Sequence, residues 1–354
     1  MANNLIILVH GMGTYEPGQM TKEVQAGLDK SLEFAGLNFD YMQDVEFYEH
    51  NYGILLDGIR KKESEALSEF SQLGINTGVI AKLNDYATNL SGDKFFYSHL
   101  LDVIYYGLTM WGERLRSNFI NDLIAQKRAG LFQGKRIHIL GYSLGTALIN
   151  DSLSKIYRDG DGDEQHFSTD HDKIEKYWSI ANVSRIIHGL NDINGADPKT
   201  NVVTDNIGGC IKKMTVAAHK YDPFMLVKPY ERVPVNGRFH HPSGITQANT
   251  HDLTGYLAHP EIGLNLIYDL YSTESGIDAN NLASAIDKHK ATTFNSDLAN
   301  LQTLWDDLVD SIDAPIIAID NAINLIDSVK AYQQRIESLL FADNLVSMMP
   351  GDNI

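Results

Sequence analysis

A Gly-x-Ser-x-Gly pentapeptide, Gly141-Tyr142-Ser143-Leu144-Gly145, limits the folds open to this chain more than any other segment. Residues 136–140 before it (Arg-Ile-His-Ile-Leu) predict a strand, and the helical spacing of residues 144–158 predicts a helix. A serine in so sharp a turn sits at a strained backbone angle, and glycines on both sides remove side chains that would collide with strand and helix. The pattern predicts an exposed serine hydroxyl above a helix N-terminus. A glycine-rich turn with an ordinary serine is the alternative.

A second strand-and-glycine segment opens the chain. Leu5-Ile6-Ile7-Leu8-Val9 predicts a buried parallel strand, and His10-Gly11-Met12-Gly13 follows it directly. Backbone N–H groups aimed at a developing negative charge are the usual donors to an oxyanion. We expect the N–H of Leu144 to be one such donor and that of Met12 the other. A strand-end turn with a packed His10 is the alternative reading of this loop.

The alternation of strand-like and helix-like segments predicts an α/β fold with a mostly parallel sheet flanked by helices. A helical pattern over 19–37 and a strand over 39–48 open a βαβ unit. Further strands are expected within 177–187 and over 211–218, and the last core helices over 253–257 and 262–270. The region 51–130 is helical nearly throughout and longer than one crossover requires, so we expect a helical cap insertion there. Residues 1–270 would then form one domain that carries the serine.

Residues 271–354 are predicted to form a separate, acidic helical extension. From Glu261 to Ile354 there are 15 Asp and Glu against 4 Lys and Arg. Apolar residues recur at helical spacing over 298–312 and 316–340, and each apolar stripe must be buried against something. We expect a helical hairpin packed on the core. A homo-oligomer interface or a mobile lid over Ser143 is the alternative.

Composition excludes several classes of protein. The formal net charge of −17 argues against nucleic acid as the main partner, because phosphate binding needs a basic surface. The single cysteine, Cys210, excludes a disulfide framework and cysteine-based metal sites. No apolar run approaches the length of a membrane span. The first residues have no secretory signal pattern, so we expect a cytoplasmic protein, with signal-independent export left open.

Two segments weakly resemble metal-binding motifs. The segment Asp159–Glu164 resembles the first half of a calcium loop, but Glu164 stands where such a loop needs glycine. His166 and His171 lie near several aspartates at a spacing that fits no zinc-ligand pattern. We therefore expect no metal and no cofactor.

With its His-Gly-Met-Gly loop, its Gly-x-Ser-x-Gly turn, Asp222 and His251, the chain resembles the α/β-hydrolase superfamily, in particular its lipase- or esterase-like serine hydrolases. The resemblance covers roughly residues 4–50 and 130–270. It implies the α/β-hydrolase fold and a catalytic triad in the order serine, acid, histidine. The first predicted strand begins at residue 5, so we expect no counterpart of the antiparallel first strands of larger members.

The resemblance also directs the choice of acid and base. The acid follows a late strand, and Asp222, just beyond strand 211–218 and before Pro223, fits best; Asp192 is the competitor. The base lies after the acid, and His251 is in a polar loop that leads into an apolar helix. Other histidines that follow the acid are His240, His241, His259 and His289.

The resemblance implies a serine ester hydrolase that forms an acyl-enzyme on carboxylic or lipid esters. A thioesterase, acyltransferase or amidase would use the same triad, so these reactions stay open. The contrasting class is a non-catalytic hydrolase-fold module that binds a partner through its C-terminal helices. The expected partner of the leading interpretation is a small-molecule or lipid ester.

Overall fold

The computed structural model describes residues 3–13, 15–61, 102, 106–107, 111–157, 167–190, 197–227, 229–293 and 331–341. Within these ranges the chain has an α/β architecture, as predicted, with one six-stranded sheet whose strands are all parallel. The strand order is β2-β1-β3-β4-β5-β6. The strands are β1 (Asn4–Val9), β2 (Val45–His50), β3 (Arg136–Tyr142), β4 (Ile174–Ile180), β5 (Ile211–Ala217) and β6 (Arg238–His240).

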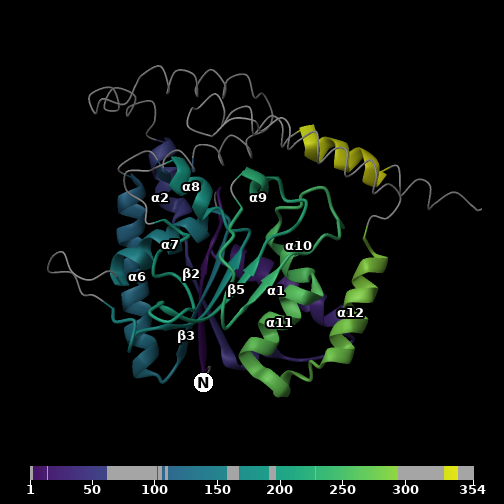
Figure 1. Ribbon diagram of the computed structural model, residues 1–354, viewed down its shortest axis with the longest axis horizontal. Helices are drawn as coiled ribbons and strands as arrows, with labels where there is room; N and C mark the ends of the chain where they lie inside the picture. Colours follow the sequence, from purple (N-terminus) through teal and green to yellow (C-terminus); the bar gives the residue numbers. More distant parts are fainter. Residues whose placement is uncertain are drawn as a thin grey trace, which may run out of the picture.

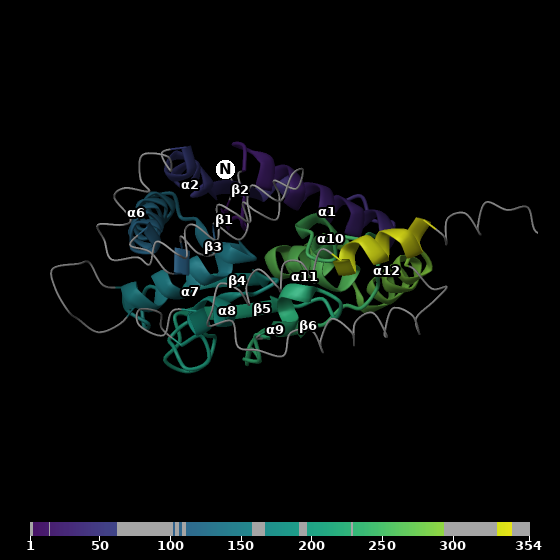
Figure 2. The same cartoon turned by 90° about the horizontal axis from the view of Figure 1, so that it is seen from above.

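Two groups of helices cover the two faces of the sheet (Figures 1 and 2). Helix α1 packs against α10, α11 and α12, and α7 packs against α6 and α8. Because helices cover both faces of the sheet, all six residues of β1 are buried. Five of them are apolar, and the sixth, Asn4, is hydrogen-bonded. The helices are α1 (Gln19–Ala35), α2 (Gly53–Lys61), α6 (Trp111–Phe132), α7 (Leu144–Tyr157), α8 (Ser184–Leu190), α9 (Pro223–Val227), α10 (Leu253–Ala258), α11 (Pro260–Tyr271) and α12 (Ala279–Ala291).

The order of the strands creates a switch point between β1 and β3. The chain runs from β1 through α1 to β2 on one side, and β3 then pairs with the other side of β1. Right-handed crossovers that run in opposite directions place their helices on opposite faces, which separates α1 from α7. The loops that follow β1 and β3 therefore diverge at the carboxyl ends of neighbouring strands. In open α/β sheets this crevice is where ligands bind.

Several element boundaries differ from the sequence prediction. The second strand begins at Val45, because the side chain of Asp40 accepts a hydrogen bond from Met42 N and the chain forms a 3-10 turn, η1 (Tyr41–Asp44). The expected strand within 177–187 is β4, which starts earlier at Ile174 and gives way to α8. The short edge strand β6 was not expected. Helix α12 was also missed; it is set by a capping box of Asp278 and Asn281 rather than by an apolar stripe.

The region expected to form the insertion is described only in part, and most of 62–110 lies outside the described residues. Helix α6, which falls in that range, packs against β3 and α7 and buries Leu115, Phe119 and Leu123. Of the extension, residues 294–330 lie outside the described residues, whereas 331–341 are helical. None of the helices described is both long enough and apolar enough to span a bilayer.

Candidate active site

Ser143 occupies a strained turn between β3 and α7. Its φ is +52°, in the left-handed region that residues with a side chain rarely adopt. The turn is fixed by the neighbouring strand, because Ser143 N donates to Ile180 O at 3.0 Å. It is fixed from the helix side as well, because Thr146 N and Thr146 Oγ1 both donate to Ser143 O. Strain held by the surrounding structure is common at functional sites.

The two glycines of the pentapeptide permit close packing around this turn. A Cβ on Gly145 would lie 2.3 Å from Val9 O and 2.4 Å from His10 O. A Cβ on Gly141 would lie 2.4 Å from Ile149 Cδ1. The start of α7 is thus pressed against the end of β1, which brings the first glycine-rich loop beside the serine.

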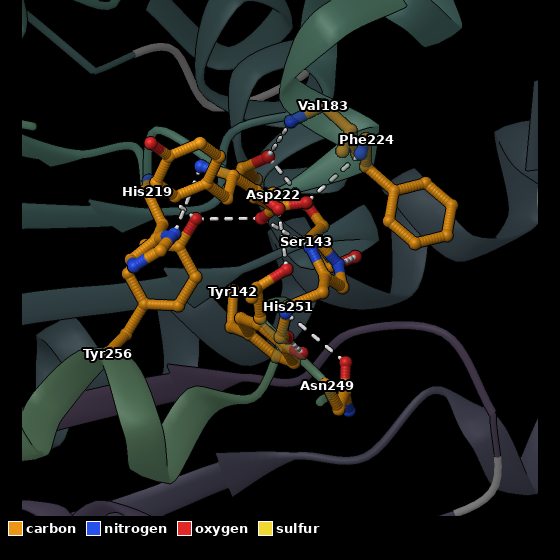
Figure 3. Close-up of polar contacts among 12 residues, drawn as sticks. Tyr142, Ser143, Val183, His219, Asp222, Phe224, Asn249, His251 and Tyr256 are labelled. Atoms are coloured by element: carbon orange, nitrogen blue, oxygen red, sulfur yellow. Dashed lines mark hydrogen bonds and ion pairs between the residues drawn. The ribbon is translucent and has the colours of Figure 1, made fainter. Parts of the chain in front are cut away.

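Asp222 and His251, predicted to act with Ser143, form a hydrogen-bonded chain with it (Figure 3). Nε2 of His251 lies 2.8 Å from Ser143 Oγ, and Nδ1 of His251 lies 2.7 Å from Asp222 Oδ2. A carboxylate is acceptor only, so Nδ1 carries the proton and Nε2 presents its lone pair to the serine hydroxyl. This tautomer is the one a general base toward Ser143 requires.

Asp222 lies in the loop between β5 and α9 and is completely buried. Its Oδ1 accepts from Phe224 N at 3.0 Å, and its Oδ2 accepts from the hydroxyl of Tyr256 at 2.7 Å as well as from His251. Burial, with the neighbouring carboxylate as the next cause, raises the pKa of Tyr256 well above its ordinary value, so this hydroxyl stays a donor. Three donors compensate the cost of burying the charge.

The main chain of His251 is held at both of its polar groups. Its N–H donates to Asn249 Oδ1 at 3.2 Å, and its carbonyl accepts from the hydroxyl of Tyr142, the residue before the serine. Burial raises the pKa of Tyr142 well above its ordinary value, which keeps the phenol protonated. The ring of Phe224 lies 4.5 Å from the imidazole, centroid to centroid. The base is therefore fixed in position as well as in tautomer.

His10 is a packing residue of the first glycine-rich loop. Its ring is stacked between Tyr15 and Tyr52, with centroids 4.5 Å and 4.1 Å away. Burial lowers its pKa to about 4, so the imidazole is neutral. Nδ1 donates to Gly11 O at 2.7 Å, and Nε2 accepts from Gly53 N at 3.3 Å. Both ring nitrogens are occupied, and the side chain shapes the loop without offering a proton acceptor to a substrate.

The same loop passes directly against the serine. A Cβ on Gly11 would lie 3.0 Å from Ser143 Cβ, so the close approach depends on glycine at this position. Gly13 has φ +92°, and its N–H donates to Asp102 Oδ2 at 2.5 Å. Among the described residues, neither the amide of Met12 nor that of Leu144 has a hydrogen-bond partner. Both residues are buried, and backbone N–H groups without a partner are the usual donors to an oxyanion.

The other candidates for the acid and the base have different surroundings or lie outside the described part of the chain. Asp192 lies outside it. His240 ends β6, and His241 follows it. His259 joins α10 to α11, and its ring lies 4.4 Å from that of His289 on α12. Burial, followed by the nearby His289, lowers the pKa of His259 to about 3, which keeps the ring neutral.

The calcium-like motif and one histidine of the zinc-like motif fall outside the residues that the structure describes. The whole acidic segment 158–166, including His166, lies outside the described residues, and His171 is exposed. Across the ranges that the structure describes, no three His, Cys, Asp or Glu side chains come together in a way that could hold a metal ion.

Three residues that shape the site were missed from the sequence: Tyr142, Asn249 and Tyr256. Asn249 carried a usable signal, because an Asn two residues before a loop residue often accepts a hydrogen bond from its amide. Tyr142 and Tyr256 carried none, since their partners lie far away along the chain. Comparison of the chain with protein-family models, with curated proteins and with solved structures gives no match.

Proposed function

We propose that this protein is a serine hydrolase of the α/β-hydrolase type that cleaves carboxylic or lipid esters through an acyl-enzyme. One observation carries the proposal: Ser143, His251 and Asp222 are joined by hydrogen bonds of 2.8 Å and 2.7 Å at a strained strand-to-helix turn. The all-parallel sheet and the position of the serine at the β1–β3 switch point support the fold assignment.

The geometry suggests a role for each group. Ser143 Oγ attacks the acyl carbonyl while His251 Nε2 accepts the hydroxyl proton. Asp222 keeps the imidazole in its tautomer and stabilises the imidazolium. The amides of Leu144 and Met12 bind the oxyanion of the tetrahedral intermediate. Loss of the alcohol, with the proton returned by His251, leaves an acyl-enzyme, and water then attacks it by the same route.

The experiment is active-site labelling followed by a substrate panel. A fluorophosphonate probe should label wild-type protein at Ser143, and neither Ser143→Ala nor His251→Ala should be labelled. His259→Ala is the matched control for a buried histidine outside the triad and should be labelled like wild type. The rates of hydrolysis of short- and long-chain esters, phospholipids, acyl thioesters and amides then show which leaving group and acyl chain the enzyme prefers. Folded wild-type protein that neither reacts with the probe nor cleaves any of these substrates would contradict the proposal and favour a non-catalytic module.

A further inference from the structure

The C-terminal helical segment, residues 331–341, lies on the two loops that carry the acid and the base. It is the yellow helix of Figure 1 and begins 80 residues after His251 in the sequence. Tyr332 and Ile336 are buried in a small apolar cluster with Tyr221 and Ile245. Ala248, Leu339 and Leu340 pack at the margin of this cluster. Tyr221 precedes the acid, and Ile245 lies in the loop that leads to the base.

The cluster is tied to the acid loop by a further hydrogen bond. Thr250, adjacent to the base, donates its hydroxyl to Tyr221 O at 2.7 Å, so the two loops are joined beneath the helix. Burial is the main cause that raises the pKa of Tyr332, and the charges of Tyr221 and Asp222 add to it. The segment therefore covers the point where the two loops meet.

A polar contact continues from the helix to the base itself. Gln333 Nε2 donates to Asn249 Oδ1 at 3.3 Å, and the same oxygen accepts the N–H of His251 at 3.2 Å. Asn249 thus joins the C-terminal helix to the main chain of the base. Gln333 is half-buried, whereas the adjacent Gln334 is exposed.

We propose that the C-terminal helical segment is part of the catalytic unit, with Gln333 and Asn249 as positioning residues that hold His251 in line with Ser143. This inference rests on the proposed function and extends it to a segment outside the region that resembles the hydrolases. The oxygen of Asn249 is oriented from one side by Gln333, and it restrains the base from the other. A displacement of about 1 Å at such a base is enough to cost on the order of 10²-fold in rate.

The test uses the full-length chain and a matched pair of helix variants. Gln333→Glu removes the donor and keeps the shape, and Gln334→Glu adds the same charge at the exposed neighbour. We expect Gln333→Glu to slow fluorophosphonate labelling of Ser143 and kcat by about tenfold with little change in KM, and Gln334→Glu to change neither. Asn249→Ala should slow the labelling of Ser143 and lower kcat by a similar factor, again with little change in KM. The double variant should lose no more than Asn249→Ala alone, because the two residues act through one contact.

A conservative variant separates positioning from mere folding. Asn249→Asp keeps an oxygen that can accept from both Gln333 and His251, so it should retain most of the rate. Its added negative charge favours the imidazolium, and the acid limb of its pH–rate profile should move to higher pH. Equal loss of rate in Asn249→Asp and Asn249→Ala, without that displacement, would contradict a positioning role.

Amide hydrogen exchange gives a readout that needs no activity. Peptides that cover residues 245–252 should exchange faster in Gln333→Glu than in wild type or Gln334→Glu. If wild-type protein is inert toward probe and esters while this difference in exchange is present, the proposed function fails and the restraint on the base stands. If wild type is active but Gln333→Glu matches Gln334→Glu in rate and exchange, the inference is wrong. Fast exchange of residues 331–341 in wild type would also overturn it.

Discussion

The hydroxyl of Tyr256 donates to Oδ2 of Asp222, the same oxygen that receives Nδ1 of His251. The phenol also accepts the main-chain N–H of His219 at 2.8 Å, in the loop that leads to the acid. Tyr256 therefore holds both the carboxylate and its loop from the side of α10. Because the Tyr256 hydroxyl remains protonated, it stabilises the buried carboxylate of Asp222 as a neutral hydrogen-bond donor.

Replacement of Tyr256 by phenylalanine should lower both stability and turnover. The change leaves the buried N–H of His219 without its acceptor and removes one donor from Asp222, which should cost about 1–3 kcal/mol in the free energy of unfolding. Turnover should fall by about tenfold, because the carboxylate gains freedom to rotate away from His251. Chemical denaturation and ester kinetics measure the two effects. Tyr268→Phe, at a half-buried tyrosine beneath Arg238, is the control and should change neither.

Substitution of Gly145 should prevent the elbow from forming. The Cβ of valine would meet the main-chain oxygens of Val9 and His10 at well under van der Waals distance, and backbone atoms cannot give way as a flexible side chain can. We expect Gly145→Val to give insoluble protein or a strongly lowered melting temperature. Gly58→Ala in α2 is the matched control, because a Cβ there meets nothing within 4 Å. Normal melting of Gly145→Val would contradict the close packing of α7 on β1.

Features of the site that arise from local sequence could be predicted, and features that arise from distant pairings could not. The strained turn at Ser143 needs glycines at fixed positions, so five consecutive residues are enough to predict it. The resemblance to the α/β-hydrolases predicts which residues are the acid and the base, and the structure brings them together with the serine. By contrast, no sequence pattern pairs Tyr256 with Asp222 or Gln333 with Asn249.

Two elements that the sequence did not predict, α12 and β6, have little apolar patterning. Helix α12 is mostly polar, with Ala285 and His289 as its buried residues, so its apolar spacing gave no signal. Strand β6 has three half-buried residues at the sheet edge, too few for an alternating pattern. Strand β6 is decided by its pairing with β5, whereas α12 is started by the local capping box of Asp278 and Asn281.

Acid should destabilise the protein through His138. This residue of β3 is buried against Trp178 and donates from Nε2 to Asn4 Oδ1 at 3.0 Å. Burial, with Lys176 as the next cause, lowers its pKa to about 3. The unfolded chain binds a proton at this histidine below about pH 6.5, whereas the folded chain does not. The free energy of unfolding should therefore fall as pH drops from about 6.5 towards 3.

The contribution of His138 is measured by difference. His138→Gln keeps a side-chain donor for Asn4 and has no ring to titrate, so its stability should depend less steeply on pH than that of wild type. His171→Gln, at an exposed histidine, should follow the wild-type curve. The measurement is the melting temperature of wild type and of the two variants between pH 7 and pH 4. Parallel curves for His138→Gln and wild type would show that another group dominates.

The identity of the acid is tested by a pair of amide substitutions. Asp222→Asn keeps the size of the side chain but can present an N–H to His251 Nδ1, which favours the wrong tautomer of the base. Turnover should then fall by about 10⁴-fold, while the fold is retained because the remaining side-chain oxygen, at the position of Oδ1, still accepts from Phe224 N. Asp192→Asn, outside the described residues, should leave turnover within a fewfold of wild type. Ester kinetics and fluorophosphonate labelling give the ranking, and a larger loss in Asp192→Asn would transfer the role of acid to that residue.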